Sequence, residues 1–136
     1  WWPALDLGFV LKQTGEQEQA KRILEALLRD LESSTRLTPF WGYAIIDVHA
    51  HELLGDRDEA LAKLEQAFDA GWRTFWRYEL KTDLSLASMH DDPRFRSVVS
   101  RIEADMAAQL ALLREWEANG ELSPVPAELQ AGRSAR

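Results

Sequence analysis

Two stretches of this chain, forty residues apart, repeat the same order of glycine, acidic and apolar residues. The first reads GEQEQA from Gly15 to Ala20, and the second reads GDRDEA from Gly55 to Ala60. Apolar residues follow at helical spacing, at positions 24, 27 and 28 in the first copy and 64, 67 and 68 in the second. This order is typical of a helix–turn–helix unit, in which a glycine ends one helix, a polar turn follows and a second amphipathic helix begins. We therefore expect two copies of one helical hairpin.

Composition limits the partners and chemistries that are open to the chain. It has 136 residues, a net charge of −7 and no cysteine. The negative charge argues against a general affinity for nucleic acid or for anionic membranes. The lack of cysteine excludes disulfides, thiol catalysis and cysteine-ligated metals. We expect a cytoplasmic protein, and the start at Trp1, without methionine or a signal peptide, indicates a domain cut from a longer protein.

Hydrophobic periodicity predicts helices along nearly the whole chain. Thr38 before Pro39, and Asp92 before Pro93, are typical of helix starts, because proline suits the first helical position after a capping side chain. The expected elements are helices at residues 4–13, 16–32, 39–54, 57–70 and 72–81, a connector at 83–91, a long helix at 93–118 and a weakly ordered tail at 121–136.

The first hairpin also carries a recognisable order of small and apolar residues. In sequence these are Ala4, Leu7, Gly8, Leu11, Ala20 and Leu24. This order resembles the signature of the tetratricopeptide repeat (TPR), W-x2-L-G-x2-Y followed by A-x3-F and P. The chain departs from that signature where Ala4 and Ala44 replace the tryptophan, and where Asp47, Val48 and His51 stand in the second copy.

The TPR resemblance implies an all-α, TPR-like α-solenoid. One domain would cover residues 1–120, made of repeats at about 1–32 and 39–71, a half-repeat at 72–82 and a capping helix at 93–118. Paired helices would approach closely at Ala20 and Ala60, so a larger side chain there would push them apart. The run Asp92 to Phe95 after an aromatic-rich half-repeat also resembles the ends of TPR regions in bacterial multidomain regulators.

A concave groove lined by the first helix of each pair follows from the same resemblance. The side chains implied for partner binding are Trp2, Leu5, Phe9, Lys12 and Gln13 of the first copy and Ile45, His49 and Glu52 of the second. Their mixture of apolar and charged groups suits an amphipathic helix or an extended peptide. Leu5, Phe9 and Ile45 occupy the surface that a carboxylate clamp would need, so such a clamp is rejected. Alternatively, these three residues contact the capping helix.

Metal, catalytic and nucleic-acid sites find little support in the sequence. His49 and His51 are two apart and would point away from each other on a helix, so they cannot chelate one ion. Ser85 has no ordered histidine or aspartate context, and no cofactor motif is present. Near residue 75, the aromatic side chains Trp72, Phe75 and Trp76 are expected to face the core, with the cations Arg73, Arg77 and Lys81 on the opposite face.

The resulting functional hypothesis is a non-catalytic protein-interaction module that binds a protein or peptide and needs no cofactor. The alternative is an oligomerisation module, such as a homodimer, that associates through its apolar ends. Leu110, Leu113 and Trp116 near the end of the long helix would pair with another chain in that case. A domain that senses a small molecule is a third alternative, and it would need a pocket beside the aromatic half-repeat.

Overall fold

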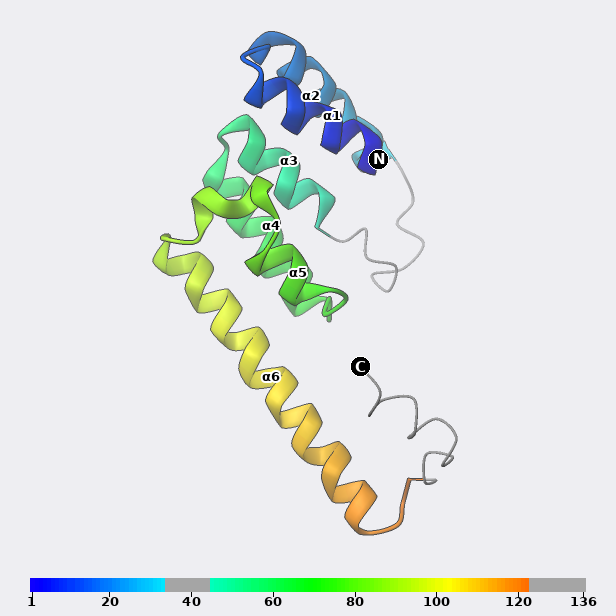
Figure 1. Ribbon diagram of the computed structural model, residues 1–136. Helices are drawn as coiled ribbons and strands as arrows, with labels where there is room; N and C mark the ends of the chain where they lie inside the picture. Colours follow the sequence, from blue (N-terminus) through cyan, green and yellow to red (C-terminus); the bar gives the residue numbers. More distant parts are fainter. Residues whose placement is uncertain (34–44, 123–136) are drawn as a thin grey trace, which may run out of the picture. The chain divides into compact units, whose positions relative to one another are not determined.

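The computed structural model describes residues 1–33 and 45–122, and the elements within these ranges are all helical (Figure 1). They are α1 (Trp2–Gln13), α2 (Gln17–Ser33), α3 (Ile46–Leu54), α4 (Arg57–Asp69), α5 (Trp76–Lys81), the 3-10 helix η2 (Leu84–Met89) and α6 (Pro93–Ala118). The all-α class predicted from the sequence is confirmed. The expected helix start at Pro39 and most of the expected tail, residues 123–136, lie outside the described residues.

The two repeated glycines end their helices in the same way. Gly15 and Gly55 have φ angles of +90° and +89°, a conformation that glycine adopts without steric cost. After α1, the Glu16 amide donates to the Leu11 carbonyl at 2.8 Å, and after α3 the Asp56 amide donates to the His51 carbonyl at 2.9 Å. These bonds satisfy carbonyls that each helix end would otherwise leave unpaired. The sequence repeat therefore corresponds to a repeat of backbone geometry.

Gly8 sets the spacing between the first two helices. A Cβ atom added at Gly8 would lie 2.7 Å from Cδ2 and 2.8 Å from Cγ of Leu24, which is closer than real Cβ contacts come. Leu24 is buried on α2, and Ala20, one turn earlier, is buried as well. The hairpin of α1 and α2 is thus packed through small residues on both helices, as the sequence predicts.

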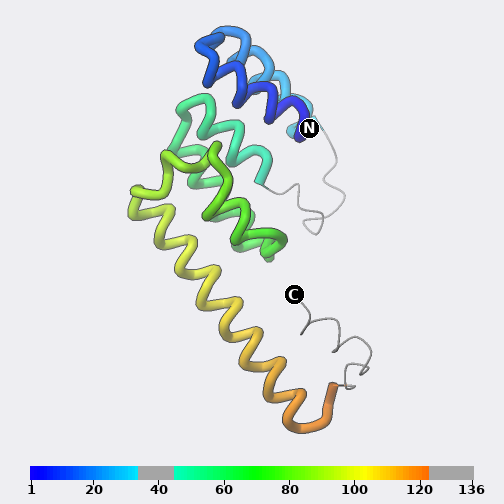
Figure 2. The backbone as a smooth tube through the Cα atoms, viewed as in Figure 1, coloured from blue at the N-terminus to red at the C-terminus, as the bar shows by residue number. Residues whose placement is uncertain are grey.

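The second hairpin packs on the first through α3. This helix contacts both α1 and α2, and α4 returns beside it (Figure 2). A continuous apolar core joins the hairpins, formed by Leu5, Leu24, Leu27, Leu31, Ile46, Ala50 and Leu53. Trp2 and Phe9 of α1 pack against its edge. Because α3 is covered by two helices of the first hairpin and one of its own, seven of its nine residues are buried.

The region after α4 differs from the expected helix at 72–81 and connector at 83–91. Trp72 does not begin a helix, because its amide donates back to the Ala67 carbonyl at 2.9 Å to close the end of α4. Helix α5 begins at Trp76, after Phe75 in a left-handed conformation with φ of 52°. The expected connector contains η2, which begins where Asp83 Oδ1 accepts the Ser85 amide at 2.8 Å.

Helix α6 has the bounds that the sequence predicts. By compactness the chain divides into one unit of residues 1–102 and a second unit that begins at Glu103, so α6 contributes to both. In the first unit, Phe95, Val98 and Ile102 are buried. In the second unit, Gln109 Nε2 donates to Asp105 Oδ2 at 2.9 Å along the helix. None of the helices in the described ranges is long and apolar enough to cross a membrane.

Replacing Gly8 by valine should destabilise the first unit, because the new side chain overlaps Leu24. Overpacking of this kind costs about 1–3 kcal/mol. The measurement is urea unfolding followed by circular dichroism, for Gly8→Val, Leu24→Ala and the double variant. If the overlap is the cause, the double variant will be more stable than the sum of the two single effects predicts. Simple additivity of the two effects would contradict the assigned contact.

Candidate functional site

Of the eight groove residues implied by the TPR resemblance, four are buried, three are half-buried and one is exposed. Those of α1 range from buried to exposed: Leu5 is buried, Trp2, Phe9 and Lys12 are half-buried, and Gln13 is exposed. Those of the second copy, Ile45, His49 and Glu52, are all buried. Lys12 Nζ donates to the Leu53 carbonyl near the end of α3. The predicted surface is therefore largely occupied by contacts within the chain.

The segment that covers this face of α3 is η2. Ser85 of η2 contacts His49, and Ser88 Oγ donates to Glu52 Oε1, so two serines one turn apart meet two polar side chains of α3. Leu86 and Met89 of η2 are completely buried beside them. The alternative expectation placed the long capping helix on Leu5, Phe9 and Ile45, whereas the segment that packs on α3 is η2.

His49 is the centre of a buried polar cluster. Its side chain is fully buried, with Nε2 lying 3.1 Å from Glu79 Oε2 and Nδ1 lying 2.5 Å from Ser85 Oγ. Because a carboxylate only accepts hydrogen bonds, Nε2 carries the proton in the contact with Glu79. The indole of Trp2 meets the imidazole edge-on, at 6.0 Å between ring centres. The cluster thus joins α3, α5 and η2 through one histidine.

Hydroxyl, imidazole and carboxylate follow one another here in the order found in hydrolytic triads. The expectation that Ser85 lacks a histidine or aspartate partner is therefore wrong. However, Ser85 Oγ also lies 2.7 Å from Asp83 Oδ1, a second acceptor that competes with His49 Nδ1 for the single hydroxyl hydrogen. The imidazole has no exposed surface on which to receive a substrate. These contacts favour a structural network over an activated nucleophile.

The same cluster contains three groups that can ligate a metal. Donor atoms of His49, Glu79 and Asp83 lie within 4.8 Å of one another. The two carboxylates face different ring nitrogens: Glu79 faces Nε2, and Asp83 Oδ1 lies 4.0 Å from Nδ1. A bound zinc ion would need all three donors at about 2.0–2.2 Å around one point, whereas the shortest contacts here involve different ring nitrogens. The cluster therefore has the donor types of a metal site, although its closest pairs are arranged as hydrogen bonds.

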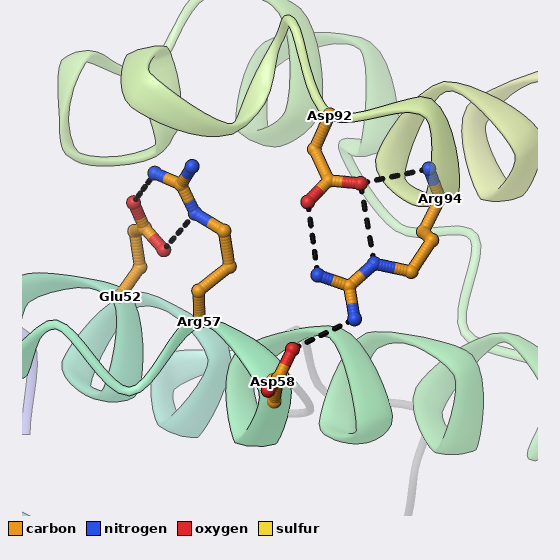
Figure 3. A network of polar contacts seen from close by, with 5 residues as sticks. All are labelled: Glu52, Arg57, Asp58, Asp92 and Arg94. Carbon is orange, nitrogen blue, oxygen red and sulfur yellow. Dashed lines mark hydrogen bonds and ion pairs between the residues drawn. The ribbon is translucent and has the colours of Figure 1, made fainter.

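A second polar network joins α3, α4 and the start of α6 (Figure 3). Arg57 Nη2 donates to Glu52 Oε1 at 2.7 Å, and this hydrogen bonding raises the pKa of the guanidinium above its usual value. Arg94 joins Asp92 at 3.1 Å and Asp58 at 2.7 Å. Hydrogen bonds from the side chain and the backbone amide of Arg94 lower the pKa of Asp92. In both networks the polar side chains are paired with one another, and these pairs link neighbouring helical segments.

Large apolar side chains are exposed at several places in the described residues. They are Trp1 before α1, Leu7 and Val10 of α1, Phe75 before α5, Tyr78 of α5, Leu84 at the start of η2, and Leu110, Leu112, Leu113 and Trp116 of α6. Trp72 and Trp76 are buried, as predicted, but the prediction for Phe75 is wrong, because 73% of this residue is exposed. The left-handed backbone at Phe75 turns it out of the helical register assumed for it.

The cations of this region do not share one helix face, contrary to the expectation. Arg73 lies before α5, where its Nη1 donates to the Phe68 carbonyl at 2.9 Å and its guanidinium lies over the Phe68 ring. Arg77 and Lys81 are one turn apart on α5, and both lie over the ring of Trp76. Their charged groups therefore make cation–π contacts with a buried aromatic residue, while both residues remain exposed.

Comparisons with known proteins found no match to this chain among family models, curated proteins or solved structures. The TPR resemblance therefore depends on the signature residues themselves. Gly8, Ala20 and Leu24 are the signature positions for which the structure supplies a packing reason.

Replacing Glu79 by alanine should destabilise the first unit, because Nε2 of the fully buried His49 would lose its acceptor. An unpaired buried donor costs about 1–3 kcal/mol. Thermal and urea unfolding of Glu79→Ala would be compared with Glu65→Ala, since Glu65 is an exposed glutamate of α4. The control should change the unfolding free energy by no more than about 0.5 kcal/mol. Equal changes of the unfolding free energy in the two variants would contradict the structural role assigned to the His49 cluster.

Asp92 should stabilise the folded chain at neutral pH, and this stabilisation should be lost in acid. Its pKa is lowered by folding from an ordinary value of 3.8, so its contribution is complete above that pH and is lost as the pH falls through the lower folded value. Asp92→Asn keeps an oxygen that can accept the Arg94 amide but removes the charge. We expect this variant to be less stable than wild type at neutral pH, with a difference that shrinks in acid.

The measurement is the thermal midpoint of wild type and of Asp92→Asn, from neutral pH down to below the ordinary pKa of 3.8. Asp92→Ala serves as a comparison, since it removes the helix cap at every pH. A difference between wild type and Asp92→Asn that stays constant down to strongly acidic pH would contradict the assigned ion pairing.

Proposed function

We propose that this chain is a non-catalytic protein-interaction module with a TPR-like arrangement of helices, and that it belongs to a larger bacterial regulatory protein. The observation that carries the proposal is the exposure of large apolar side chains on α1, α5 and α6, three helices that also bury residues in the core. Exposed apolar surface on a folded body marks a site for another protein where such side chains gather into a patch. The link to a bacterial regulator is supported by the sequence run Asp92 to Phe95.

Three features support the TPR-like arrangement. The close approach of Gly8 to Leu24 gives a steric reason for the signature glycine. The helix ends at Gly15 and Gly55 share one hydrogen-bonding pattern, as expected of two copies of one unit. Helix α3 packs on both helices of the preceding hairpin, which is how successive helix pairs bury a continuous core in repeat proteins.

Because the α3 face is buried, we place the proposed docking surface on side chains that are at least partly exposed. Because η2 covers His49 and Glu52, partner contacts in the implied groove are left to its α1 side, where Phe9 is half-buried and Gln13 is exposed. Leu7 and Val10 of the same helix and the aromatic side chains beside α5 add apolar surface. Such surfaces suit a helical or extended segment of another protein.

Association between copies of this chain is the second candidate, and one observation favours it. The apolar stripe of α6 is buried at Phe95, Val98 and Ile102, but its continuation at Leu110 and Leu113 is about half exposed, at 50% and 46%. A helix that continues its apolar stripe onto exposed residues presents a seam that another helix can cover. Oligomerisation through α6 would bury these side chains.

Charged substitutions at exposed apolar positions should distinguish binding of a partner protein from self-association. Val10→Glu and Leu113→Glu alter α1 and α6, and Ala111→Glu is the matched control, since Ala111 is exposed about 160° around the helix from Leu113. Proteins retained from lysate of the source organism would be purified and their binding to the variants measured by calorimetry. We expect Val10→Glu to weaken the binding of a retained partner, while Ala111→Glu leaves it unchanged.

Sedimentation of the same variants tests the second candidate. A wild-type oligomer that Leu113→Glu dissociates, with Ala111→Glu unchanged, would establish self-association through α6. A chain that sediments as a monomer and retains no protein that binds when purified would contradict both functions.

A further inference from the structure

The hydrogen bonds around His49 are one hydrogen short. Nε2 carries a proton in the contact with Glu79, so Nδ1 of the neutral ring is an acceptor. The group that faces Nδ1 is the Ser85 hydroxyl, at 2.5 Å, and this hydroxyl also lies 2.7 Å from Asp83 Oδ1. Two acceptors therefore share a single hydroxyl hydrogen, and Nδ1 belongs to a side chain with no exposed surface.

The cluster is also short of positive charge. Glu79 and Asp83 place one carboxylate near each nitrogen of the same ring. Within the described residues, the side-chain contacts of both carboxylates are with His49 and Ser85, and neither of these has a fixed positive charge. Burying a carboxylate is costly unless a cation or several hydrogen bonds compensate it. The missing hydrogen and the missing charge both point to a cation on the Nδ1 side of the ring.

Asp83 gives this side of the ring an opening to solvent. Its side chain is 23% exposed, whereas that of Glu79 is 8% exposed. Asp83 Oδ1 lies 4.0 Å from Nδ1, and donor atoms of His49, Glu79 and Asp83 lie within 4.8 Å of one another. Two ligands of a tetrahedral zinc ion are roughly 3.4 Å apart, so a small rotation of the Asp83 side chain would bring both atoms onto one ion.

We propose that His49 and Asp83 bind a divalent transition-metal ion, and that zinc is the ion that fits these donors best. Nδ1 and the Asp83 carboxylate would be direct ligands, with the Ser85 hydroxyl and water in the remaining positions. Glu79 would keep its hydrogen bond from Nε2, because a metal-binding histidine commonly donates its other nitrogen to a carboxylate that orients the ring. The two positive charges of the ion would balance the two carboxylates.

The donor types select the class of ion. Imidazole nitrogen is a ligand of zinc and other transition metals, whereas magnesium and calcium prefer oxygen ligands. Because His49 belongs to α3 and Asp83 is the residue before η2, the ion would join these two elements and hold η2 on α3. The site would thus be structural, and it does not depend on the proposed protein-interaction function.

The test is titration of the purified full chain with zinc chloride, after metals have been removed with a chelator. Calorimetry should show one ion per chain, and the thermal midpoint should rise with the free zinc concentration, because the ion binds the folded state. Asp83→Asn keeps an oxygen that can accept the Ser85 amide but loses the charged ligand. This variant should melt near wild type without zinc and bind zinc about tenfold more weakly or worse.

Two glutamine variants complete the comparison. Glu79→Gln preserves an acceptor for Nε2 but removes the charge that orients and balances the ring, so zinc binding should again weaken by about tenfold or more. His51→Gln removes the other histidine of α3 and is the matched control, which should bind zinc as wild type does. Calcium and magnesium chloride should leave the midpoint of wild type unchanged at the same concentrations.

Three outcomes would overturn the inference. A midpoint that zinc does not change would make a second proton, on Nδ1 of His49, the missing cation. Zinc binding that is kept in Asp83→Asn and lost in His51→Gln would place the ion elsewhere on α3. A preference for calcium over zinc would contradict an imidazole ligand. The proposed protein-interaction function would be unaffected by any of these results.

Discussion

The burial of α3 on nearly every side is the constraint on which the rest of the structure depends. A nine-residue helix packed against α1, α2, α4 and η2 leaves little surface for solvent, yet it carries the buried residues Asp47, His49 and Glu52. Burying a polar group is costly unless the group is hydrogen-bonded. Glu79, Ser85 and Ser88 meet that requirement for His49 and Glu52, so α5 and η2 are held by polar side chains that lie 30 to 36 residues earlier in the chain.

Features that depend on local sequence could be predicted. The periods of α1, α2, α4 and α6 and the helix ends at Gly15 and Gly55 follow from residues within one or two helical turns. The close packing of Gly8 on Leu24 joins neighbouring helices of one hairpin. Helix η2 was missed, although Asp83 as a cap and the three-residue spacing of Leu86 and Met89 were signals for it. A short 3-10 segment is stabilised mainly by what it packs on, which periodicity does not reveal.

The site was harder to predict than the fold, because it depends on segments that are distant in sequence. His49 and Ser85 are 36 residues apart, and nothing near either residue indicates the other. Phe75 was assigned to the core by its helical spacing from Trp72 and Trp76, but the spacing argument fails when a residue between them leaves the right-handed conformation. The covering of His49 and Glu52 was not foreseen for a related reason: η2, which lies over α3, is distant from it in sequence.

The late position of η2 in the chain also has a consequence for synthesis on the ribosome. Chains emerge from the N-terminus, and local hairpins such as α1–α2 and α3–α4 form much faster than translation proceeds. Both hairpins can therefore assemble before Leu84–Met89 has been made. During that interval the α3 face that holds His49 and Glu52 is uncovered and hydrated. The nascent chain would briefly expose polar side chains of α3 that the finished protein buries.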